Sequence, residues 1–416
     1  MRIKSLLCCG AALVSISGAS NAAVINLIDV GFAGSPARQA QFRAGFQIAA
    51  DYWGSVLTNN VTINLGVGTD ALGVGVIGST GSKATDYSVV NWERRINATK
   101  SNSAVDSNIV LPTLTGGGAS FITNGVAPAP FTDPDSGETS NPLQDDLTTQ
   151  RYVNGSTASS RTLYLNNAVI KAIGGRVAGV NDTSLDGTVR FSTNFNFDFN
   201  PTDGITQNTF DFIGVAIHEI GHALGFVSGV DYLDVLGVGP GNSPNEGIAG
   251  YSLNDTSIYS ALDMFRYSRD PNNIAPGTEP SLDLAVGGTK YFSIDGGKTA
   301  LFGNTMSTGR FNGDGQQASH WKEAPGCQIG NGLLDPTFCF GQTGFVTGLD
   351  LAAFDAMGWN LNVDALSYTT RSTGSIYTQF AVAVPETATW GMMILGFGMM
   401  GGAMRRRSAP KVTFAV

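Results

Sequence analysis

The stretch 218–226 reads His-Glu-Ile-Gly-His-Ala-Leu-Gly-Phe and holds two of the three histidines in a chain of 416 residues. Residues four positions apart lie on one face of an α-helix, so His218 and His222 can direct their ring nitrogens at one metal ion. Glu219 is turned away from that line but stays within reach of a water molecule at the metal, where a general base must stand. The segment therefore predicts a zinc site on a helix.

The other face of this segment is apolar. Ile213, Ile217, Ile220 and Leu224 recur at helical spacing and would bury the helix against a core. Ordinary buried helices carry the same stripe, so the alternative is that the two histidines are incidental core residues. The helical context and the glycine at position 225 are both expected of a zinc-binding motif, and they favour the metal.

A catalytic zinc ion normally has three protein ligands and leaves a fourth position to water. The compact pattern of metzincin peptidases places its third histidine where this chain has Ser228. The remaining histidine is His320, in the segment Ala-Ser-His-Trp-Lys at 318–322. A downstream glutamate is the alternative ligand, and Glu246 or Glu279 could supply it. Both lie among Pro, Gly and Asn rather than in a helical pattern, so they rank below the histidine.

The long gap between His222 and His320 resembles the leishmanolysin branch of metzincins, in which an insertion separates the zinc helix from a third ligand in a Ser-His-Trp segment. The resemblance is closer still to leishmanolysin-like secreted bacterial metalloproteases that carry a C-terminal sorting tail. It extends over much of 212–359 and includes the segments 261–267 and 349–359.

This resemblance implies an α+β fold of the zincin type, in which a mixed sheet packs on the zinc helix and two lobes flank a cleft. It assigns Zn²⁺ to His218, His222 and His320. It also makes Glu219 the general base in the hydrolysis of a protein or peptide substrate. The alternative from another class is a surface or matrix protein whose zincin-type domain only binds its partners. The presence of Glu219 argues against that alternative.

In metzincins a tight turn that contains a methionine lies beneath the metal. The corresponding stretch here is 332–337, with Leu333 or Leu334 in the place of the methionine. Cys327 and Cys339 flank this turn. A disulfide between them would close a short loop and contribute about 3 kcal/mol, and an exported chain favours such a bond over two free thiols.

The two ends of the chain indicate export. Residues 1–22 combine basic residues, an apolar run and a small-residue cleavage site, which is typical of a secretory signal peptide removed by signal peptidase. Residues 384–408 resemble the PEP-CTERM sorting signal of Gram-negative bacteria, which a membrane exosortase reads and usually cuts, although Thr387 replaces the second proline of that motif. The apolar part is shorter than the roughly 20 residues of a spanning helix, so we expect transient membrane contact rather than a permanent anchor. We therefore expect the mature protein to be located outside the cell or on its surface.

Between these ends we expect a catalytic domain at 23–362, with an N-terminal lobe to about 227 and a C-terminal lobe at 228–362. A tether at 363–383 would precede the sorting segment, and a tail at 409–416 would follow it. The net charge is −9 and the charged residues make up only 14% of the chain, with no basic stripe outside the terminal arginines, so we expect no nucleic-acid partner.

Hydrophobic periodicity predicts a strand at 24–30, a helix at 35–57 and a strand at 61–67, with the zinc helix packed beneath their sheet. A further helix is predicted near 87–98, within a region 72–162 that otherwise reads as loops. Residues 188–194 are expected to form the edge strand above the zinc ion, where an extended substrate could pair.

The region between the second and third histidines, 229–319, reads mostly as loop. Within it, Asn-Gly-Asp-Gly at 312–315 is a weak candidate for Ca²⁺, since the same dipeptides also form hairpin turns. A capping pattern at Thr347 predicts a C-terminal helix that ends near Trp359 and packs behind the site.

Overall fold

The computed structural model describes residues 22–128, 130–132, 135–241, 252–277 and 280–381. The signal peptide, the sorting segment and the tail lie outside these residues, apart from residue 22, as do Glu246 and Glu279. Within the described part of the chain, no helix is both long and apolar enough to cross a membrane.

The N-terminal part forms as predicted. Strand β1 (Val24–Asp29), helix α1 (Pro36–Val56) and strand β2 (Thr62–Asp70) follow one another, and the Ser35 side chain caps α1 by accepting a hydrogen bond from the backbone of Arg38. Strands β1 and β2 are parallel, and β11 (Leu185–Ser192) continues the parallel sheet on the other side of β2. The fourth strand, β3 (Gly78–Ser82), pairs antiparallel with β11 and completes a mixed sheet in the order β1-β2-β11-β3.

The prediction that residues 188–194 form the edge strand is wrong. Most of 188–194 belongs to β11, which is an inner strand between β2 and β3, and the edge is β3. The sequence of β3 is Gly-Ser-Thr-Gly-Ser, which has no alternating apolar pattern. Its place in the sheet comes from backbone pairing with β11, and a pattern of side chains does not record such pairing.

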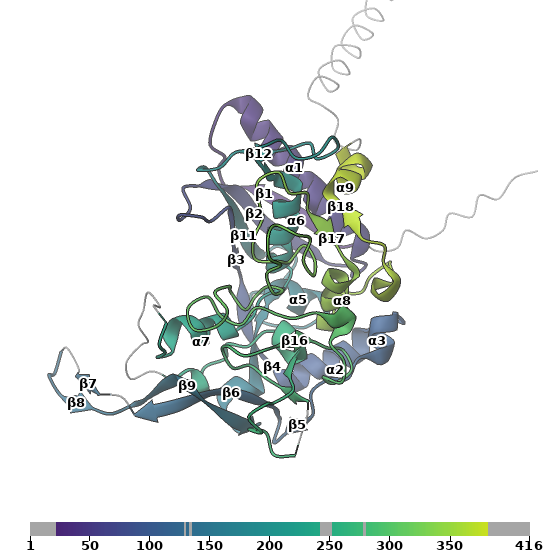
Figure 1. Cartoon of the computed structure of the whole chain (residues 1–416). Helices are drawn as coiled ribbons and strands as arrows, with labels where there is room; N and C mark the ends of the chain where they lie inside the picture. Colours follow the sequence, from purple (N-terminus) through teal and green to yellow (C-terminus); the bar gives the residue numbers. More distant parts are fainter. Residues whose placement is uncertain (1–21, 129, 133–134, 242–251, 278–279, 382–416) are drawn as a thin grey trace, which may run out of the picture.

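The prediction of loops across 72–162 is also wrong for much of that region. Helix α2 (Val89–Thr99) is present as predicted, but β4 (Ala84–Ser88) pairs with β10 (Thr162–Asn166). Strands β6 (Gly118–Pro128) and β9 (Leu143–Asn154) form a long antiparallel hairpin that reaches away from the body in Figure 1. These strands are rich in Thr, Asn, Gln and Gly, so they lack the alternating apolar residues by which a strand is recognised in a sequence.

The zinc helix of the prediction is α6 (Phe212–Ala223), and it is buried on all sides rather than on one apolar face. Its neighbour α1 donates a hydrogen bond from Trp53 Nε1 to the carbonyl of Ile217 at 3.0 Å. The ring of Phe212 packs against Gly45 of α1, where a side chain would collide with it. A cluster of phenylalanine rings fills the space between the sheet, α1 and the start of α6, with members Phe42, Phe46, Phe191, Phe197 and Phe212.

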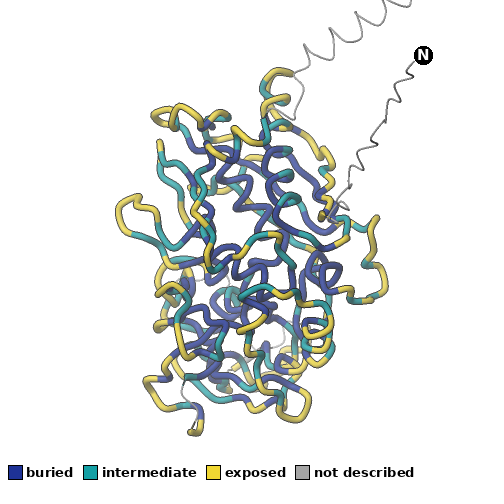
Figure 2. The backbone as a smooth tube through the Cα atoms, turned by 90° about the vertical axis from the view of Figure 1, so that its right-hand side faces the viewer, coloured by how far each residue is buried: buried dark blue, intermediate teal, exposed yellow. Residues whose placement is uncertain are grey.

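Helix α8 (Gly348–Met357) begins at the predicted cap Thr347, and Trp359 after its end donates from Nε1 to the carbonyl of Leu224 at 2.9 Å. Residues 363–383, expected as a tether, include α9 (Thr373–Phe380), whose Ile376 is fully buried. Figure 2 shows the buried backbone running through the interior of both the upper and lower parts of the molecule.

The described residues of 229–319, namely 229–241, 252–277 and 280–319, have little regular structure, as predicted. They contain α7 (Val230–Leu236), a 3-10 helix (Leu262–Phe265) and a small sheet of β14 (Arg266–Ser268), β15 (Ser281–Leu282) and β16 (Tyr291–Phe292). The remaining short elements are the helices α3 (Ala104–Asn108), α4 (Ala158–Arg161) and α5 (Asn167–Ala172), and the strands β5 (Leu114–Thr115), β7 (Phe131–Thr132), β8 (Thr139–Ser140), β12 (Phe197–Asp198), β13 (Phe210–Asp211), β17 (Phe345–Val346) and β18 (Arg371–Ser372). Three further 3-10 turns are Leu253–Asp255, Leu301–Gly303 and Ala365–Ser367.

Candidate metal centre

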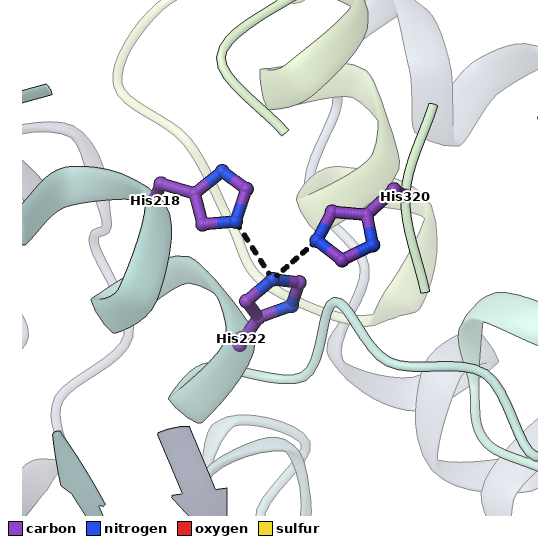
Figure 3. A group of neighbouring side chains, drawn as sticks. All are labelled: His218, His222 and His320. Atoms are coloured by element: carbon purple, nitrogen blue, oxygen red, sulfur yellow. Dashed lines mark hydrogen bonds between the residues drawn. The ribbon is translucent and has the colours of Figure 1, made fainter. Parts of the chain in front are cut away.

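The three histidine rings meet at one point. His218 and His222 extend from α6, and His320 reaches them from a loop 98 residues after His222 (Figure 3). The Nε2 atom of His222 lies 3.0 Å from that of His218 and 3.1 Å from that of His320. Three nitrogens bound tetrahedrally to zinc at about 2.0–2.1 Å would be about 3.3 Å apart. The cluster is therefore close to the geometry of a zincin-type site before any adjustment.

The Nδ1 atom of each ring faces a backbone carbonyl oxygen, which can only accept a hydrogen bond. Nδ1 therefore carries the proton, and each Nε2 is left with a lone pair. Three lone pairs directed at one another repel unless a cation lies between them. Metal-binding histidines in proteins are oriented in this way by their second nitrogen. The carbonyl partners are those of Leu333 for His218 at 2.8 Å, Phe226 for His222 at 2.6 Å and Gln317 for His320 at 3.3 Å.

Burial keeps these rings neutral. Removal from solvent disfavours the charged imidazolium and is the main cause of the lowered pKa values. The pKa of His218 falls to about 3 and that of His222 to about 4, and the pKa of His320 falls well below its ordinary value. Neighbouring imidazoles lower the pKa of His218 and of His320 further. At neutral pH all three rings are unprotonated at Nε2 and can hold a metal ion.

Glu219 lines the same cleft and is held by the edge strand. Its Oε2 accepts a hydrogen bond from Thr80 Oγ1 at 2.7 Å, and its carboxyl group packs on Gly78, where a Cβ atom would lie 2.5 Å from Oε1. Burial raises the pKa of Glu219 to about 7, and the hydrogen bond from Thr80 opposes that rise. A carboxyl group with a pKa near neutrality can both take up and return a proton.

The turn at 332–337 supports His218 from below. Leu333 supplies the carbonyl to its Nδ1, and Leu334 packs against α6 at Gly221. Both leucines are buried.

Asp350 lies in the first turn of α8, within the capping pattern that begins at Thr347. In the structure its buried carboxylate accepts hydrogen bonds from the backbone of Leu333 at 2.9 Å and of Leu334 at 3.2 Å, and from Trp321 Nε1 at 2.8 Å. It thus joins the turn beneath His218 to the residue that follows His320. The capping pattern at Thr347 was the one signal in the sequence that marked this aspartate.

The predicted disulfide is present. Cys327 and Cys339 are bonded and have a Cα–Cα distance of 5.7 Å, so the loop that carries Leu333 is closed covalently.

A cleft of about 810 Å³ is lined by the three histidines. The edge strand β3 and the preceding residues 74–77 line one side, and the segment that leads to His320 lines another. Four aromatic side chains also line it: Phe195, Phe210, Phe338 and Phe340.

The weak calcium candidate at 312–315 gains no support. The carboxylate of Asp314 pairs with Lys322 Nζ at 2.7 Å and accepts from the backbone of Thr308, while the Asn312 side chain bonds to Asp234 and to the backbone of Gly241. Both side chains are engaged within the protein.

Comparisons with protein-family models, with curated proteins and with solved structures find no match to this chain. The structure by itself therefore carries the functional argument: a buried group of three histidines whose ligand atoms all lie within 4.8 Å of one another, consistent with a zincin-type site.

Proposed function

We propose that this protein is a zinc-dependent endopeptidase of the leishmanolysin-like metzincin type, with two lobes around the cleft. One observation carries the proposal. Three histidine nitrogens converge in a cleft that also holds Glu219, whose carboxyl group is fixed by Thr80. That set supplies three ligands, an open coordination position and a general base, which together suffice for metal-assisted hydrolysis.

Zn²⁺ held by His218, His222 and His320 would polarise the scissile carbonyl and lower the pKa of a water molecule to roughly 7. Glu219 takes the proton of that water and returns a proton to the leaving amine. Thr80 orients the Glu219 carboxylate by its hydrogen bond. The edge strand β3 offers main-chain groups to an extended peptide, which suits a protein or peptide substrate.

We also propose that the protein acts outside the cell. The Cys327–Cys339 disulfide is typical of an oxidising compartment. Signal peptidase would remove the signal peptide, and an exosortase would process the PEP-CTERM-like tail. The tail would contact a membrane only transiently. The protein would then remain on the surface of a Gram-negative bacterium or be released.

The test is zinc stoichiometry measured together with casein cleavage on the mature protein. We expect about one zinc per chain, and we expect a chelator to abolish cleavage and zinc to restore it. Glu219→Gln should keep the zinc and lose about 10²- to 10⁴-fold in kcat. Glu93→Gln, a change at a half-buried carboxyl group outside the cleft, is the matched control.

Two results would contradict the proposal. Undiminished zinc binding by His320→Ala would show that His320 is not the third ligand. Wild-type protein no more active than Glu219→Gln on casein and on a broad peptide library would favour a binding module that retains the metal site.

A further inference from the structure

We propose that Asp231 is a positioning residue that holds the His320 segment in place and so completes the metal site. The inference rests on the zinc site of the proposed function, but it concerns metal binding and not peptide cleavage. His320 lies 98 residues after His222, yet a metal ion requires its ring to be placed accurately beside the other two.

Asp231 takes up the polar groups immediately before the third histidine. Its Oδ1 accepts a hydrogen bond from the backbone of Ala318 at 2.7 Å. Its Oδ2 accepts from the backbone of Ser319 at 3.1 Å and from the Ser319 hydroxyl. One carboxylate thus binds three donors on the two residues that precede His320, which fixes both the position and the direction of that backbone.

Asp231 lies in the first turn of α7, only eight residues after α6 ends at Ala223. Ser228 stands where the compact metzincin pattern has its third ligand, and its backbone N–H donates to Ser319 Oγ at 2.8 Å. The Ser228 hydroxyl donates to Asp263 Oδ1 at 2.6 Å, so this side chain is engaged within the protein and is not a metal ligand. Together with Asp231, Ser228 forms the surface on which the distant ligand segment docks.

Arg266 holds the same segment from the other side. Its fully buried guanidinium donates to the carbonyl of Ser307 at 2.7 Å and to that of Ala318 at 3.5 Å. Ala318 is therefore held at its N–H by Asp231 and at its carbonyl by Arg266. The negative charge of Asp231 and the positive charge of Arg266 therefore lie on either side of the Ala318 backbone. Their mutual attraction adds to the hydrogen bonds.

Closing a long loop onto a ligand position costs chain entropy, and the cost is met before the metal arrives only if the loop is docked independently of the metal. The contacts of Asp231 provide such docking. Without them, His320 would have to be immobilised by the ion itself, and the metal affinity would fall.

The experiment measures metal binding to Asp231→Asn and Ser319→Ala in the full mature chain. Asparagine keeps the shape but turns an N–H donor toward donors already present. We expect zinc affinity about 10- to 100-fold weaker for Asp231→Asn, the usual range for loss of a group that orients a metal ligand. In the cobalt-substituted protein, the visible absorption spectrum should shift toward that of His320→Ala, because this spectrum reports the number and arrangement of ligands.

Asp270→Asn is the matched control. Asp270 is a buried aspartate of the same insertion that accepts from the backbones of Ile274 and Ala275, and it has no bond to the His320 segment. It should lose stability with an unchanged cobalt spectrum. If Asp231→Asn does not fold, Ser319→Ala carries the test, with a smaller shift in the same direction.

Wild-type zinc affinity and an unaltered cobalt spectrum in the folded Asp231 or Ser319 variant would overturn the inference and leave the proposed function standing. A wild-type chain that binds no zinc would overturn both. A chain that binds zinc in the expected way but cleaves no peptide would sink only the proposed activity.

Discussion

The Nδ1 atom of His218 lies 2.8 Å from the carbonyl oxygen of Leu333, and this contact joins α6 to a turn more than a hundred residues away. It fixes the tautomer of the ring and therefore the direction of its Nε2 lone pair. The turn is held in place by Asp350, which binds the backbone N–H groups of Leu333 and Leu334.

Replacement of Asp350 by Asn should therefore affect the metal site as well as stability. The amide group cannot accept all the hydrogen bonds now made by the carboxylate, so buried donors are left unpaired. We expect the free energy of unfolding to fall by about 3 kcal/mol and zinc affinity to weaken about 10- to 100-fold. Urea denaturation and competition with a chromogenic chelator measure the two effects. Asp364→Asn is the control, because it makes the same chemical change at the exposed cap of a 3-10 turn, where an amide oxygen can still accept the capping hydrogen bond. Unchanged zinc affinity in Asp350→Asn would show that the turn does not orient His218.

Gly78 should be intolerant of any side chain. A Cβ atom there would lie 2.5 Å from Oε1 of Glu219 and 2.9 Å from its Cδ, so Gly78→Ala must displace the carboxyl group. Because a displacement of about 1 Å can cost roughly 100-fold in rate, we expect kcat to fall by about that factor with zinc content unchanged. Gly81→Ala in the same strand is the control, since nothing lies within 4 Å of its added methyl group. Equal activity of the two variants would mean that the position of Glu219 is not critical.

The pH dependence of peptide cleavage should have an acidic limb set by Glu219. Burial raises its pKa to about 7, and a bound dication would lower it again, so the limb should lie below roughly pH 7. Only the carboxylate accepts a proton, so kcat/KM should rise with pH up to the pKa and then level off. Thr80→Val removes a hydrogen bond that lowers this pKa, and it should move the limb to higher pH. A pH profile that is identical in both proteins would contradict this role of Thr80.

Loss of the disulfide should destabilise the protein without removing the metal ligands. The double change Cys327→Ser and Cys339→Ser opens a loop with a sequence separation of 12 residues. We expect the free energy of unfolding to fall by about 3 kcal/mol, chiefly because the unfolded chain gains freedom. Denaturant titration of the double variant, compared with wild type in the presence and absence of a reductant, measures this. A reductant that lowers the wild-type midpoint but not that of the double variant would assign the effect to this bond.

Local patterns were enough to predict much of the site and part of the fold. The spacing of His218 and His222 places both on one helical face whatever the surroundings, because the period of an α-helix is a property of the backbone. The start of α1 at Ser35 and the start of α8 at Thr347 were predicted for the same reason, since a capping side chain bonds to groups within the next turn. His320 was found through a resemblance and through the scarcity of histidine, and the structure brings its ring to the other two.

Long-range pairing could not be predicted in this way. The small residues of β3 carry no apolar alternation, so only the folded sheet shows that Gly78 and Thr80 contact Glu219. The hairpin of β6 and β9 was missed for a similar reason, because its stability comes from partners across the sheet.

The sequence by itself determined which residues can bind a metal and which can accept a proton, because those abilities belong to the side chains and to helical spacing. Only the tertiary structure decided what holds them. Asp231 and Asp350 are ordinary acidic residues in the chain, and each orients the site solely because folding places its carboxylate against backbone N–H groups from distant segments. The identity of a hydrogen-bond donor far along the chain is not encoded in the local pattern, so the support of the metal site emerges only with the fold.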